Sequence, residues 1–173
     1  MSLYYPNNSS KLRKMVLFSL LGAILVIFKE VNPIRYNIEF VSTLIIAYTC
    51  VFGWYALIPT YIFVAIEQIL YGFNIWTYFY LYAWAILVLI SFPFRKLRSP
   101  ILWAMIAGVF GLSFGALSAI TSYFIGGWGA AVAYWTSGLW FDLTHCVGNF
   151  IITLLLCYPL RILLEKGKET LKI

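Results

Sequence analysis

The chain has 173 residues, of which 63% are hydrophobic and 10% are charged. Soluble domains carry about 25% charged residues, so the composition excludes an ordinary soluble domain and indicates an integral membrane protein. The net charge of +6 does not indicate nucleic-acid binding, because the basic residues stand at the ends of apolar segments, as they do in cytoplasmic loops.

The chain begins with a polar tail, residues 1–14, which we expect to be cytoplasmic. The first apolar run, 15–28, predicts a membrane helix that extends over about 11–29. No small-residue cleavage site follows it, so we expect no cleavable signal. Ser19 and Ala23 form a small-xxx-small pair, which lets a second helix approach closely.

Three further helices are predicted in the first half of the chain. A loop at 30–37 leads to the second helix, Gly53 and Trp54 turn the chain into the third, and Pro93 stops the fourth. These three helices are expected at 38–52, 55–71 and 77–92.

The fifth predicted helix, 101–124, has one face of small residues. Its members are Ala104, Gly108, Gly111, Gly115 and Ala119. In lipid such a face usually allows close helix packing, so we interpret it as structural. A Gly- and Trp-rich stretch, 125–138, is expected to be an irregular link. The sixth helix is predicted at about 140–166, which closes one membrane domain over 15–166 and leaves 167–173 as a cytoplasmic tail.

The basic clusters predict the orientation of an all-α protein with six transmembrane helices. Lysines and arginines place both termini and the loop at 93–99 in the cytoplasm. The loops at 29–37, 71–77 and 124–139 are then outside. In this topology Glu39, Glu67 and Asp142 all lie at the outer ends of helices.

The last helix carries a polar face. Asp142, His145 and Asn149 have offsets of 0, 3 and 7, which place them on one side of a helix. An ionisable residue at this depth costs about 2.5–3.5 kcal/mol on insertion scales and usually faces a cavity or a partner. We therefore expect an outward-facing pocket with polar groups and aromatic walls. Its expected substrate-binding residues are Glu39, Glu67, Tyr71, Tyr82, Trp84, Trp135, Asp142, His145 and Asn149.

Functions other than substrate binding in this pocket are also considered. Asp142, His145 and Cys146 do not have a strong metal-ligand spacing, and we expect neither a metal nor a cofactor. An intramembrane enzyme that uses His145 and Asp142 is the alternative of another class, although we expect no catalytic residue. A purely structural subunit with internal hydrogen bonds is a third hypothesis. The chain has no G-x-x-x-x-G-K-[ST] motif, so it cannot by itself power transport with ATP.

Three strings carry a resemblance to a known family. They are NIEFVSTLIIAYTCVFG at 37–53, WAMIAGVFGLSFGAL at 103–117 and FDLTHCVGNFIITLLLCYPL at 141–160. With the size and the six predicted helices, they resemble the S components of energy-coupling factor (ECF) transporters. S components are the membrane subunits that bind the substrate, and the similar group comes from Gram-positive bacteria.

The resemblance implies a function in the plasma membrane. An S component captures a vitamin from outside, docks on a T component and topples in the membrane, driven by two ATPases. Docking uses an A-x-x-x-A pattern in the first helix; here Ser19 replaces the first alanine and Ala23 matches the second. The loop at 30–37 would gate the pocket. The similarity favours cobalamin or a related corrinoid as the substrate, with pantothenate and hydroxymethylpyrimidine as alternatives.

Overall fold

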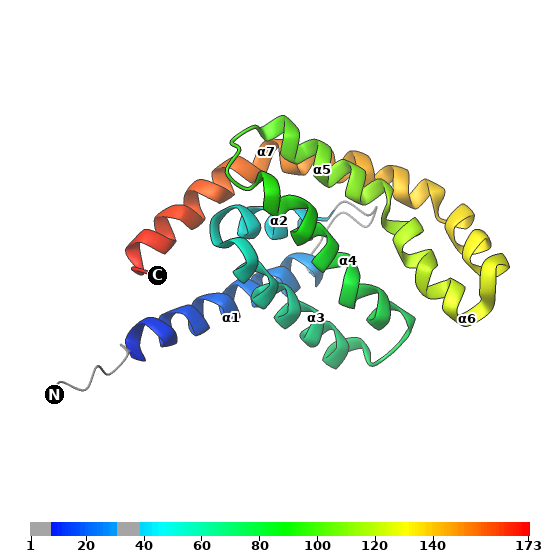
Figure 1. Cartoon of the computed structure of the whole chain (residues 1–173), viewed down its shortest axis with the longest axis horizontal. Coiled ribbons are helices and arrows are strands. Elements are labelled where there is room, and N and C mark those ends of the chain that lie inside the picture. Colours follow the sequence, from blue (N-terminus) through cyan, green and yellow to red (C-terminus); the bar gives the residue numbers. More distant parts are fainter. Residues whose placement is uncertain (1–7, 31–38) are drawn as a thin grey trace.

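The computed structural model describes residues 8–30 and 39–173, and within these ranges it contains helices and no strand (Figure 1). Two short 3-10 turns, η1 (Gly53–Ala56) and η2 (Phe92–Phe94), interrupt the helices. The α-helices are α1 (Asn8–Glu30), α2 (Val41–Phe52), α3 (Leu57–Tyr71), α4 (Ile75–Ser91), α5 (Pro100–Leu112), α6 (Phe114–Ser137) and α7 (Leu139–Thr170).

The short helix α2 lies at the centre of the fold. It packs against α7 on one side and α4 on the other, and all of its residues are buried. The helix α5 runs along α7, and α1 packs across α3 (Figure 1). Since α2 is enclosed, polar side chains on it are withdrawn from lipid and must find partners inside the protein.

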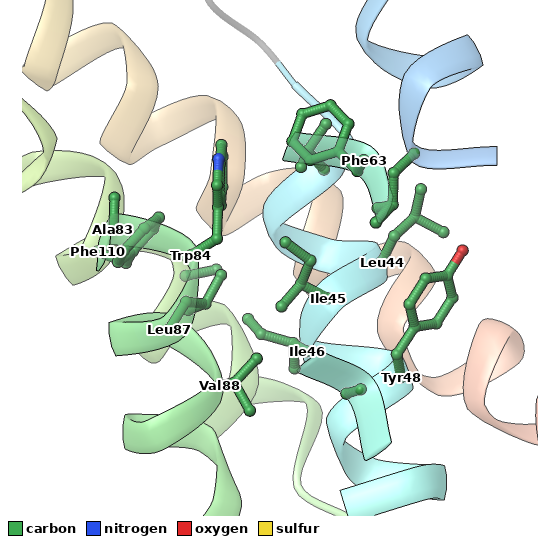
Figure 2. Close-up of a cluster of buried hydrophobic side chains, with 14 of the residues drawn as sticks. Leu44, Ile45, Ile46, Tyr48, Phe63, Ala83, Trp84, Leu87, Val88 and Phe110 are labelled. Atoms are coloured by element: carbon green, nitrogen blue, oxygen red, sulfur yellow. The ribbon is translucent and has the colours of Figure 1, made fainter. Parts of the chain in front are cut away.

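The apolar core joins α2 to α4. Ile45 and Ile46 of α2 lie opposite Leu87 and Val88 of α4, and all four are fully buried (Figure 2). Trp84 continues this core, with its ring 5.9 Å from Phe63 and 5.8 Å from Phe110, measured between ring centroids. The core therefore holds α4 against α2 and α3. It also positions the first residues of α4, which lie beside a pocket.

Local sequence explains where several helices begin and end. Asn74 caps α4 with a capping box, in which its side chain accepts from the Trp76 N–H and the Thr77 hydroxyl accepts from the Asn74 N–H. Ser99 caps α5, with Pro100 at the first helical position. Gly53 has φ 62°, a backbone conformation that favours glycine, and there the chain turns from α2 toward α3.

Four helical stretches in the described residues are long and apolar enough to cross a membrane. They are Val41–Tyr71, Ile75–Phe94, Pro100–Ser137 and Leu139–Thr170. The helical class is thus confirmed for the described residues, and these stretches fit a multi-pass membrane protein. Six crossings and cytoplasmic termini stay predictions.

Two expectations for the second half of the chain are wrong. The predicted fifth helix is not continuous, because the residue Ser113 separates α5 from α6. The expected irregular link at 125–138 is helical up to Ser137 except at Gly127, whose φ of 72° breaks α6 into two arms. In lipid a helix satisfies its own backbone hydrogen bonds, which outweighs the low helix propensity of its glycines.

Three smaller differences concern boundaries. The helix α1 begins at Asn8, inside the expected polar tail, and α7 ends at Thr170, inside the expected C-terminal tail. Glu30, the first residue of the expected gating loop, is the last residue of α1. The rest of that loop, 31–37, lies outside the described residues.

Candidate functional site

A buried ion-pair cluster joins α1, α2 and α7. The His145 Nε2 lies 2.9 Å from the Glu39 Oε1, and the Lys29 Nζ lies 3.7 Å from the Glu39 Oε2. The Ser42 hydroxyl also donates to Glu39, at 3.4 Å. Glu39 and His145 are both buried. The lysine and the hydrogen bonds thus compensate the cost of withdrawing this carboxylate from water.

The predicted polar face of α7 is present and makes a ladder of buried contacts. Asp142 accepts a hydrogen bond from the Gly115 N–H at 2.9 Å. One turn past His145, the Asn149 Nδ2 donates to the Ser42 Oγ at 3.2 Å, and Thr153 bonds to Thr43 of α2 at 2.7 Å. The spacing in the sequence therefore predicted this face correctly, and the structure adds its partners.

The glycine face of α5 and α6 lets α7 come close. A methyl group added at Gly111 would lie 2.9 Å from the backbone of His145, and one at Gly108 would lie 3.4 Å from the Cys146 carbonyl oxygen. One at Gly115 would meet the carboxylate of Asp142. These glycines hold the backbone of α7 in place, so that His145 is held against Glu39. The structural interpretation of this face fits its position.

A pocket of about 390 Å³ lies beside the cluster, and we call it the Glu67 pocket. It is formed where α1 and α3 end and α4 begins, with one aromatic residue each from α6 and α7. Its lining residues are Lys29, Glu30, Glu67, Gln68, Tyr71, Asn74, Trp76, Tyr80, Phe114 and Phe141. The volume falls within the range of about 300–1,000 Å³ that small-molecule pockets show.

The pocket and the cluster share a wall. The rings of Phe114 and Phe141 line the pocket and also lie 4.8 and 5.6 Å from the imidazole of His145, measured between ring centroids. Lys29 belongs to both, because it lines the pocket and pairs with Glu39. A ligand in the pocket would therefore contact side chains that also contact the buried Glu39–His145 pair.

The polar groups of the pocket differ in how they are held. The Tyr71 hydroxyl donates to the Glu30 carboxylate, and the Thr77 hydroxyl donates to the Gln68 side-chain oxygen. Glu67 is buried, yet its Oε1 has no hydrogen-bond partner in the described part of the chain. The same is true of the Asp142 Oδ2, the His145 Nδ1 and the Asn149 Oδ1.

The predicted pocket residues separate into two groups. Glu67 and Tyr71 line the Glu67 pocket. Glu39, Asp142, His145 and Asn149 lie in the buried cluster and ladder behind it. The three acidic residues expected to converge are thus found at the same end of the helices.

Three predicted aromatics lie elsewhere. Trp84 is fully buried in the core, and the Tyr82 hydroxyl donates to the Leu117 carbonyl oxygen at 2.6 Å. Trp135 lines a second cavity of about 430 Å³ between the two arms of α6, whose lining is almost entirely apolar. Sequence alone did not separate these positions, because helices with aromatics on every side have no polar face to orient them.

Several lining residues were not among the predicted site residues. The sequence did not assign five of the lining residues to the pocket: Lys29, Trp76, Tyr80, Phe114 and Phe141. A signal for Lys29 exists: it is a charge at the end of an apolar helix, ten residues before Glu39 in the chain. Nothing in the sequence marks Phe114 or Phe141 among so many aromatics.

The predicted docking pair lies on the outer side of α1. Ser19 is exposed and Ala23 is half-buried, on the side that also carries exposed Leu20 and Ile27. Gly22, by contrast, faces α3, where an added methyl would lie 2.6 Å from the Ile62 side chain. The small pair is therefore accessible to a second helix.

The arrangement is suited to binding a small molecule. The ranges 8–30 and 39–173 hold no group of three His, Cys, Asp or Glu side chains placed to bind a metal ion. The Glu39–His145 pair is the one carboxylate–imidazole contact that the described residues make. No protein-family model, curated protein or solved structure matches the chain.

Proposed function

We propose that this protein is the S component of an ECF-type importer, which captures a water-soluble vitamin or vitamin precursor from outside the cell. The observation that carries the proposal is the Glu67 pocket, with aromatic walls, a few polar groups and a buried polar cluster behind it. Apolar walls with few polar groups are typical of small-molecule sites. The resemblance of the three sequence strings to S components supplies the transport context.

The position of the basic residues supports an outward-facing pocket. At the end of the helices opposite the pocket, Arg13 donates to the Leu171 carbonyl oxygen and Arg161 donates to the Leu97 carbonyl oxygen. Arg98 pairs with Glu165 nearby, at 3.5 Å. Since basic clusters mark the cytoplasmic side, this end is cytoplasmic in our proposal and the pocket opens outside. Both termini then lie inside, as the six-helix topology requires.

The accessible small pair on α1 supports a docking role. Ser19 is exposed and Ala23 is half-buried, whereas the neighbouring Gly22 faces α3. Small residues allow the backbones of two helices to approach, which drives association in lipid. We propose that the T component packs on this pair, and that its two ATPases supply the energy.

The size of the pocket bears on the substrate. A volume of about 390 Å³ lies near the lower end of the range for drug-sized ligands. A corrinoid, with its large macrocycle, exceeds such ligands in size, whereas pantothenate and hydroxymethylpyrimidine are smaller. The volume alone therefore favours the two smaller alternatives over a corrinoid.

An intramembrane enzyme is the second candidate, and the Glu39–His145 contact is the observation that favours it. An imidazole held by a carboxylate is a common general base. The pair is however almost closed off, with 2% of the His145 side chain exposed. The enzyme hypothesis predicts turnover of a lipid-soluble substrate, and loss of that turnover in a folded His145→Ala variant.

Co-purification tests the proposed function. The tagged chain would be co-expressed with a T component and two ATPase subunits from the same organism, and isolated from detergent-solubilised membranes. The proposal predicts a complex of all four subunits that hydrolyses ATP and takes up a vitamin in vesicles. A chain that is isolated without these subunits, and binds no vitamin, would contradict it.

A further inference from the structure

One carboxylate oxygen of Glu67 lacks a hydrogen-bond partner among the described residues. Its side chain lines the cavity and the residue is 5% exposed, while its Oε1 makes no hydrogen bond within the residues that the structure describes. A buried carboxylate oxygen without a donor costs free energy, which a donor supplied by a ligand would recover. Glu67 is thus placed to accept a hydrogen bond from a molecule in the pocket.

The lysine of the lining makes its close ion pair with a residue other than Glu67. The lining holds one lysine and two glutamates, so its formal charge is negative. Lys29 is already paired with Glu39, which lies behind the pocket wall. The Glu30 carboxylate receives the Tyr71 hydroxyl, which is a neutral donor. The pocket therefore has an excess of negative charge that a cationic ligand would neutralise.

The walls select the shape of the ligand. Four aromatic residues line the cavity, namely Trp76, Tyr80, Phe114 and Phe141. Aromatic rings favour flat ligands by stacking, and they attract cations through their negative faces. The Gln68 side-chain oxygen is occupied by Thr77, which leaves its NH₂ group to donate to a ring nitrogen or hydroxyl of the ligand.

We infer that the Glu67 pocket binds a small, flat organic cation whose N–H groups donate to the carboxylate of Glu67. An amidine-like edge, with two adjacent N–H groups on a planar ring system, fits a carboxylate best because both oxygens can accept. The inference rests on the proposed function in taking this pocket as the substrate site. It goes further in assigning the charge and shape of the substrate, and it excludes acids such as pantothenate.

Three probes of nearly equal shape test the inference. Benzamidine carries a flat cationic amidine, benzamide is its neutral analogue, and benzoate is the anion. Binding to the purified full-length protein in detergent would be measured by calorimetric titration. We expect benzamidine to bind at least tenfold more tightly than benzamide, and benzoate to bind most weakly. Equal affinities for the three probes, or no binding of benzamidine, would overturn the inference.

The variant Glu67→Gln removes the charge and keeps the shape. We expect benzamidine to bind it at least tenfold more weakly than the wild type, with the affinity for benzamide unchanged. Glu169→Gln is the matched control, because it removes the same charge from an exposed residue near the C-terminal end of α7, away from the pocket; its effect should be less than threefold. A Glu67→Gln protein that binds benzamidine as tightly as the wild type would refute the assignment.

Two readouts keep this inference separate from the proposed function. The thermal unfolding temperature of Glu67→Gln should equal or exceed that of the wild type, since its Oε1 has no partner to lose. A preference for benzamidine that depends on Glu67, in a chain that assembles with no T component, would support the inference and defeat the transport function. High-affinity binding of an anionic vitamin, unaffected by Glu67→Gln, would support transport and overturn the inference.

Discussion

His145 and Glu39, which are 106 positions apart in the chain, are hydrogen-bonded inside the protein at 2.9 Å. The contact ties the start of α7 to the residues that precede α2, directly behind the wall of the Glu67 pocket. It links the polar face of the last helix to the acidic residues at the ends of earlier helices. The fold and the pocket therefore depend on the same pair.

Breaking this pair should destabilise the protein. His145→Ala leaves Glu39 buried with Lys29 and Ser42, and we expect a loss of about 3 kcal/mol, as for other buried pairs that lose one partner. A double-mutant cycle with Glu39→Gln, measured by denaturant unfolding in detergent, should give a coupling energy of about 1–3 kcal/mol. Effects of the two variants that simply add would show that the contact contributes nothing.

The glycine face should tolerate no side chain where it meets α7. In Gly111→Ala the new methyl would lie 2.9 Å from the His145 backbone, so α7 must move, and we expect a loss of about 1–3 kcal/mol. Gly129→Ala is the matched control, since no atom lies within 4 Å of an added methyl there. The two thermal unfolding temperatures check this prediction, and an equal effect of both variants would contradict it.

The N-cap of α4 should matter for binding as well as for stability. Asn74→Ala removes the capping box, which costs about 1 kcal/mol and loosens the helix start that carries Trp76 and Tyr80. Ser99→Ala removes the cap of α5 at the other end of the protein. We expect similar losses of stability, but weaker ligand binding in Asn74→Ala alone. Calorimetric titration measures the affinity of each variant for the ligand. Equal affinities in the two variants would argue against the Glu67 pocket as the binding site.

Two neighbouring substitutions on α1 separate docking from folding. Ala23→Leu adds bulk to the accessible face of α1 and should abolish assembly with a T component and uptake, with ligand binding unchanged. Gly22→Leu adds similar bulk against Ile62 of α3 and should instead lower the unfolding temperature. Co-purification and thermal unfolding measure the two effects. Loss of ligand binding in Ala23→Leu would count against the docking assignment.

The sequence predicted those features that charge and polarity mark. Asp142, His145 and Asn149 stand out in an apolar helix, so their spacing was enough to place them on one buried face. The positions of the basic residues set the predicted topology. That topology placed Glu39 and Glu67 at the same end of the helices as Asp142. Glycines spaced three and four apart likewise indicated the close packing between α5, α6 and α7.

Other features had no such marker. Trp84 and Trp135 both stand in apolar, aromatic-rich segments of the sequence. In the structure Trp84 is fully buried, whereas Trp135 lines the cavity between the two arms of α6. Helices that are apolar on all sides give no periodicity from which a lining residue can be identified. The glycines at 126–129 indicated an irregular link, whereas one residue, Gly127, makes the turn and the rest is helical.

Binding of a water-soluble vitamin to the purified chain is the measurement that tests the central claim most directly. Thermal unfolding would be followed against a panel that contains cobalamin, cobinamide, pantothenate and hydroxymethylpyrimidine. A ligand at a thousand times its Kd should stabilise the protein by about 4 kcal/mol. We predict one clear hit among the small, flat, nitrogen-rich compounds, and its loss in Glu67→Gln. No stabilisation by any water-soluble vitamin would contradict the claim that the Glu67 pocket is a vitamin site.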